Sequence, residues 1–171
     1  MKLGPKTRKE LMAQAKAFAH EGFVAAGYPD TSVPIHWHKG KILASTRTTY
    51  VEVFPADLVP ITGHHGLFRD PCTGSIIYIE PQVEHIINIH RAWVFLSEEQ
   101  RKCIIFHEVA HVVNHMEGHV TCNHAECFWD VFRRMGVQHK PLDVETRRKL
   151  EPHVKLPQDG KAVIKTETKA L

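Results

Sequence analysis

The sequence predicts an α+β fold, with a small, mostly antiparallel sheet packed on an N-terminal helix and on a second long helix. Three patterns indicate it: a helical periodicity over residues 6–27, a β-type run at Ser75–Glu80, and a helix start signal at Ser97. The chain has 171 residues, of which 43% are apolar, enough for one domain with a hydrophobic core.

The first predicted helix covers residues 6–27. Its apolar side chains fall on one face, and charged or amide side chains occupy the rest. Gly27 and Pro29 end it. The members of the apolar face are Leu11, Ala15, Phe18 and Phe23.

Strands are predicted in the middle of the chain. Ile35–His38 and Thr46–Phe54 have extended patterns, and Ser75–Glu80 is a β-run that stops at Pro81. Residues 60–75 are rich in Gly, Pro, Asp and Thr and predict a long loop. The stretch Val83–Val94 fits either a helix or a strand.

The strongest predicted element begins at Ser97. Ser97 and Gln100 form a capping box, so we expect a helix from here to about Met116. A further helix is predicted over His124–Arg134, and a short charged one over Val144–Leu150. We therefore expect one domain over residues 1–140, followed by a charged, partly flexible extension over 141–171.

The long helix contains the motif His107-Glu108-Val109-Ala110-His111. Two histidines four residues apart on a helix point the same way and can bind one zinc ion. Glu108 follows the first ligand and is placed to act as a general base. Apolar residues flank the motif, and buried His and Glu are costly unless paired or metal-bound. The pattern therefore predicts one Zn²⁺, with Glu108 as catalytic residue.

A catalytic zinc needs a third protein ligand. The spacing leaves several candidates open: His115, His119, His124, Glu117 and Glu126. One straight helix does not easily wrap three ligands around an ion, which disfavours His115. The start of the next helix can fold back toward the metal, which favours His124. Glu126 would serve in a site with two His and one Glu.

The run Ile104–Gly136 resembles the SprT-like and WLM-type metallopeptidases, a group that includes the Spartan proteases. Those proteins show HExxH on one helix and a third His that begins a later helix, in a pattern matched here by His124-Ala125-Glu126-Cys127-Phe128-Trp129. The resemblance implies a zincin-like fold, His107, His111 and His124 as zinc ligands, and Glu108 as base. Unlike fuller members, the sequence has no paired CxxC motifs for a C-terminal zinc ribbon.

Two alternatives remain. The ImmA/IrrE-like peptidases are similar over fewer residues, and in that reading Glu126 is the acidic ligand. A non-enzymatic, zinc-stabilised module that binds protein or nucleic acid is the other. A closed site with four protein ligands would distinguish that module from an enzyme.

For the peptidase, we expect a protein or peptide substrate that lies along the Ser75–Glu80 strand, under a cover formed by loop 60–75. The oxyanion-stabilising group stays open among four residues. They are Tyr78, His115, His119 and Arg69.

Composition adds weaker expectations. The formal charge is +3, which permits a weak nucleic-acid contact through the basic residues near Arg133 and Arg147. The chain has no apolar run of membrane-spanning length and no signal-peptide pattern, so a cytoplasmic protein without membrane contact is expected. The four cysteines lack CxxC spacing and are predicted to be reduced. His36 and His38 are expected to be ordinary surface residues.

Overall fold

The structure is a computed structural model that describes residues 3–51, 55–64, 66–80, 82–119, 124–138 and 142–156. The chain divides into two compact units. Among the described residues, the first unit comprises 3–47 and 85–156, and the second comprises 48–84. The division falls within two strands, β2 (Ala44–Val51) and β6 (Gln82–His90).

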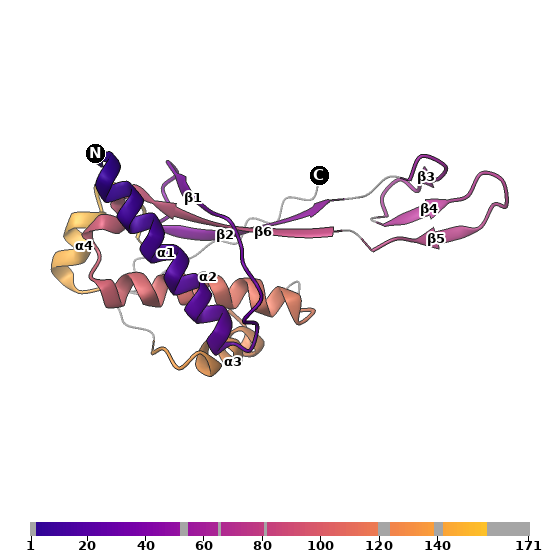
Figure 1. Cartoon of the computed structure of the whole chain (residues 1–171). Coiled ribbons are helices and arrows are strands. Elements are labelled where there is room, and N and C mark those ends of the chain that lie inside the picture. Colours follow the sequence, from indigo (N-terminus) through magenta and orange to yellow (C-terminus); the bar gives the residue numbers. More distant parts are fainter. Residues whose placement is uncertain are drawn as a thin grey trace. The chain divides into compact units, whose positions relative to one another are not determined.

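The first unit contains four α-helices, labelled in Figure 1. They are α1 (Pro5–Ala25), α2 (Glu98–Met116), α3 (Glu126–Arg134) and α4 (Val144–Leu150). A short 3-10 helix, η1 (Arg91–Phe95), connects β6 to α2. The α+β class predicted from the sequence is confirmed.

One three-stranded sheet has the order β1-β6-β2, where β1 is Ile35–His38. β1 and β6 run parallel, with Ile35 opposite Ile87 and His38 opposite His90. The ambiguous stretch after residue 83 is therefore a strand through His90, and only its end is helical. Since β2 is at the end of the sheet order, it forms one edge of this sheet.

The second unit contains an antiparallel sheet of order β3-β4-β5. Its strands are β3 (Val59–Pro60), β4 (Leu67–Arg69) and β5 (Ile76–Tyr78). The prediction of a loop over residues 60–75 is thus wrong in part, because β4 lies inside it. The strand predicted at Ser75–Glu80 is confirmed as β5. Phe68 is the buried residue of this small sheet, at 1% exposure.

The core of the first unit lies between α1, α2 and the β1-β6-β2 sheet. Trp93, Phe23, Phe106 and Ile87 are among its fully buried side chains. α1 crosses α2 closely (Figure 1), and a Cβ atom at Gly22 would approach Val109 Cγ1 to 3.3 Å. A glycine at this crossing therefore lets the two backbones pack closely, and this packing holds the motif helix in place.

The contacts divide the chain differently from the expected boundary at residue 140. Leu150 of α4 is 0% exposed and Val154 is 4% exposed, both within the core of the first unit. The amide of Lys155 donates a hydrogen bond to the carbonyl of Lys41 at 2.7 Å. Residues 142–156 thus belong to the first unit, and the rest of the predicted extension, residues 157–171, lies outside the described residues. No helix among the described residues is long and apolar enough to span a membrane.

Candidate metal centre

The motif lies on α2, as the start signal predicted. The Ser97 hydroxyl accepts from the amide of Gln100, and the Gln100 side chain accepts from the amide of Ser97. This reciprocal capping satisfies two of the free amides at the helix start. The central turns of α2 are buried, with His107 at 3% and His111 at 7% exposure. The helix therefore holds both imidazoles at fixed positions inside the first unit.

Three imidazoles converge at this point. The Nε2 atoms of His107 and His111 are 3.2 Å apart, and the Nε2 atoms of His107 and His124 are 2.9 Å apart. The ligand atoms of all three lie within 4.8 Å of one another. Tetrahedral zinc, with Zn–N bonds of about 2.0–2.1 Å, places two ligand nitrogens about 3.4 Å apart. The three histidines are close enough to hold a metal ion.

Burial favours the neutral, metal-binding form of two of these imidazoles. Burial, followed by the charge of His124, lowers the pKa of His111 to about 3. Burial also lowers the pKa of His124. Their neutral forms therefore dominate at pH 7, with lone pairs available. Neutral imidazole is the form that binds a divalent ion of the zinc type, so burial favours metal binding at His111 and His124.

His124 reaches the cluster through an unusual backbone conformation. Its φ of 56° lies in the left-handed region. Among the described residues, His124 is the single non-glycine residue with a positive φ. Histidine adopts this region more readily than most residues do, although at some cost in energy. α3 begins at Glu126, two residues later than predicted, so His124 lies in the turn before the helix. This turn aims the imidazole back at α2.

One aromatic side chain contacts all three imidazoles. The ring centroid of Phe128 lies 4.7 Å from that of His107, 4.5 Å from His111 and 4.9 Å from His124. Phe128 is 0% exposed. A rigid apolar wall on this side fixes the rings and limits water access to the centre. Phe128 belongs to the sequence pattern that follows His124, but that pattern gives no sign of this contact.

Glu108 lies beside the cluster in sequence and is 0% exposed. The Thr46 hydroxyl donates a hydrogen bond to Glu108 Oε2 at 2.7 Å. Its other carboxyl oxygen, Oε1, has no hydrogen-bond partner within the described part of the chain. Burial raises the pKa of Glu108 to about 8, although the Thr46 hydrogen bonds act in the opposite direction. A nearby cation would lower this pKa again.

Sequence reasoning missed Thr46. It lies on β2 and is 1% exposed, so its hydroxyl is buried against α2. A buried threonine in a strand pattern gives no sign of its partner 62 residues away. β2, rather than the strand predicted at Ser75–Glu80, contributes this contact to the motif helix.

The other candidate ligands lie elsewhere. Glu126 forms an exposed ion pair with Arg133. His115 packs edge-on against His85 of β6, with ring centroids 4.9 Å apart. His119 is exposed, and its backbone carbonyl accepts from the Asn114 amide group at 3.4 Å. Of the candidates, His124 is the one that the structure brings to His107 and His111.

Several other predicted residues are also placed. Tyr78 and Arg69 belong to the second unit, whereas the metal-ligand candidates belong to the first. Residues 139–141, which lie between Arg133 and Arg147 in the sequence, are not among the described residues. His36 is exposed as expected, and His38 is half-buried.

The expectation of four reduced cysteines is wrong at one position. Cys72 and Cys103 are free, but Cys127 forms a disulfide bond. Cys122 lies outside the described residues. Cys spacing alone did not predict this bond, since the expectation rested on the absence of CxxC pairs.

No protein-family model, no curated protein and no solved structure matches this chain. The resemblance to SprT-like peptidases therefore stays a prediction, and the candidate centre rests on its own geometry.

Proposed function

We propose that the protein is a zinc-dependent metallopeptidase, with His107, His111 and His124 as metal ligands and Glu108 as general base. One observation carries the proposal: a fully buried carboxylate with an unpartnered oxygen lies next in sequence to a cluster of three convergent imidazoles. A buried polar atom without a partner is costly and is found mainly where function requires it.

The residues fit the chemistry of amide hydrolysis. A zinc ion at such a site supplies Lewis acidity, which polarises a carbonyl group and lowers the pKa of water. Glu108 Oε1 is free to accept a proton from the attacking water, because Thr46 occupies only Oε2. The same carboxyl group then donates that proton to the leaving amine. Thr46 acts as a positioning residue that holds the carboxylate in one orientation.

The edge position of β2 supports a peptide substrate. An extended peptide can add to a free sheet edge through backbone hydrogen bonds, and β2 also contacts Glu108 through Thr46. We therefore propose that the substrate lies along β2. The substrate strand predicted at Ser75–Glu80 contains β5, which belongs to the other sheet.

Three-ligand geometry favours the enzyme over a structural zinc module. A closed structural site would use four protein ligands. The cluster contains three His, Cys, Asp or Glu side chains within the described ranges. Glu126 is held by Arg133 at the surface, which disfavours the ImmA/IrrE-like ligand set.

The test compares Glu108→Gln with Glu98→Gln, a matched change at an exposed position on the same helix. Zinc content is measured by mass spectrometry, and hydrolysis is measured on casein and on a peptide library. We expect one zinc per chain in wild type and both variants, and at least about a 100-fold loss of kcat only in Glu108→Gln. Thr46→Val should give a smaller loss of kcat.

Two results would overturn this function. Wild-type protein without stoichiometric zinc would remove the metal centre. Equal hydrolysis by wild type and Glu108→Gln would remove the assigned base, whatever the zinc content.

A further inference from the structure

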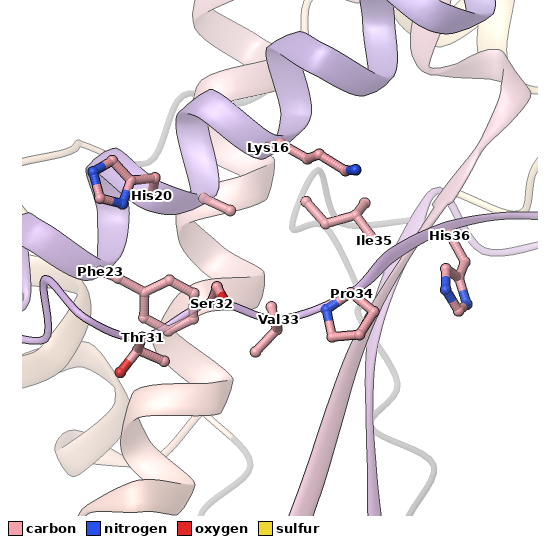
Figure 2. Close-up of a pocket in the computed structure, with 10 residues that line it drawn as sticks. Lys16, His20, Phe23, Thr31, Ser32, Val33, Pro34, Ile35 and His36 are labelled. Atoms are coloured by element: carbon pink, nitrogen blue, oxygen red, sulfur yellow. The ribbon is translucent and has the colours of Figure 1, made fainter.

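A separate pocket lies between α1 and the segment that leads into β1 (Figure 2). Its volume is about 530 Å³, within the range of small-molecule sites. None of the metal-ligand candidates lines it, so it is independent of the proposed peptidase centre. Its lining residues come from two short stretches of the first unit, 16–23 and 31–36.

The polar groups of the pocket are basic side chains and hydroxyls. Lys16 and His20 project from α1, His36 comes from β1, and Thr31 and Ser32 add hydroxyl groups. No acidic residue is among the lining residues. In Figure 2, Lys16 and His36 lie toward one end of the pocket, and His20 and Thr31 lie toward the other.

These basic groups are not neutralised by their surroundings. Lys16 has Met12, Ala13, Ala19 and His20 at the neighbouring helical positions, so no acidic side chain is within one turn. Across the sheet, His36 is opposite the uncharged Asn88. Within the described ranges, Lys16, His20 and His36 form no ion pair. By contrast, the nearby Glu21 is paired with Lys102, outside this pocket.

The walls of the pocket are apolar. Phe23 and Ile35 are buried at 1% and 5% exposure, and Val33 and Pro34 complete the wall on the β1 side. Ala19 of α1 also lines the pocket. An apolar wall with unpaired basic groups matches a ligand that has an apolar body and an anionic group.

We propose that this pocket binds a small amphipathic anion, a phosphate ester or a carboxylate with an apolar body, whose charge is held by Lys16. Both anions accept hydrogen bonds from ammonium, imidazole and hydroxyl donors, so this chemistry is shared. The apolar part of the ligand would lie against Phe23 and Val33.

The test titrates the full-length, zinc-supplemented protein with three probes: phenyl phosphate, phenylacetate and the uncharged benzyl alcohol. Amide chemical shifts in ¹⁵N-labelled protein locate the bound probe, and calorimetry gives its affinity. We expect one or both anions to shift amides within residues 16–36, and benzyl alcohol to bind at least about tenfold more weakly. The tighter anion identifies the source of the charge.

Lys16→Gln should weaken anion binding by about five- to tenfold, since it removes the fixed positive charge and keeps the helix former. Lys9→Gln is the matched control, because Lys9 is an exposed lysine on α1 outside the lining. Equal weakening by both variants would overturn the site and indicate diffuse surface charge. So would shifts confined to the region of His107, or binding of a single-stranded oligonucleotide to residues 16–36 without either small anion.

Discussion

Two groups of histidines in the first unit show what makes a metal centre. The metal-centre histidines are His107, His111 and His124, whose Nε2 atoms meet at 2.9 and 3.2 Å. The sheet-end histidines are His38 and His90, which are paired across β1 and β6 with ring centroids 5.6 Å apart. Both groups are partly or fully buried, and in both burial lowers the pKa of histidine.

The difference lies in how the ring nitrogens are used. At the sheet end, His38 Nδ1 accepts a hydrogen bond from the amide of Gly40 at 3.0 Å. His90 Nδ1 accepts from the amide of Ala92 at 3.1 Å, which caps η1. These lone pairs satisfy the backbone. In the metal-centre group the Nε2 atoms face one another, an arrangement that a shared cation would stabilise. Convergence of the ring nitrogens on one point, rather than the number of histidines, marks the centre.

The largest expected effect is the loss of metal from the first group alone. His107→Ala should weaken zinc affinity by more than the roughly 10–100-fold typical of changes to outer-shell partners, because it removes a direct ligand. His38→Ala should leave one zinc per chain. Competition with a chromogenic chelator measures both affinities. Equal zinc loss in the two variants would show that the metal-centre histidines do not bind zinc more directly than the sheet-end histidines do.

The next effect compares Phe128, which contacts the metal-centre histidines, with Phe95, which stacks on a histidine outside both groups. Phe128→Ala opens a cavity beneath three imidazoles and should lower the free energy of unfolding by about 3–5 kcal/mol. Phe95 stacks on His153, with ring centroids 5.4 Å apart, and is only half-buried. Phe95→Ala should therefore cost less. Urea unfolding of the metal-free variants measures the difference, and a larger cost for Phe95→Ala would contradict the packing described.

The smallest effect concerns pH. Burial lowers the pKa of His38 and of His90 below the ordinary value, so the unfolded chain takes up protons first as the pH falls. Their contribution to stability is complete above pH about 6.5 and is lost toward the lowered folded-state pKa. His38 and His90 are only partly buried, so we expect a loss of about 1 kcal/mol at most.

The double variant His38→Asn, His90→Asn tests this expectation. The asparagine oxygen can accept the Gly40 and Ala92 amides in place of Nδ1, but it does not titrate. Urea unfolding at pH 7 and pH 5 should show a smaller loss of stability than in wild type. An unchanged pH dependence would assign the loss to other groups.

Local patterns determined a large part of this protein. The capping box at Ser97 predicted the start of α2, because capping depends only on residues three positions apart. The spacing of His107 and His111 placed two imidazoles on one helical face for the same local reason. The α+β class and most element positions followed from periodicity in the same way.

Tertiary structure decided the rest. The third metal ligand depends on a left-handed turn at His124 and on how α3 packs against α2, and the sequence left five candidates open. The partner of Glu108 lies 62 residues away on β2, and the strand expected beside the motif belongs to a different sheet. Residues within one helical turn are fixed by backbone geometry, whereas contacts between distant segments depend on the packing of the whole unit. For that reason the motif helix was predictable from sequence, and the surroundings that complete its candidate metal centre were not.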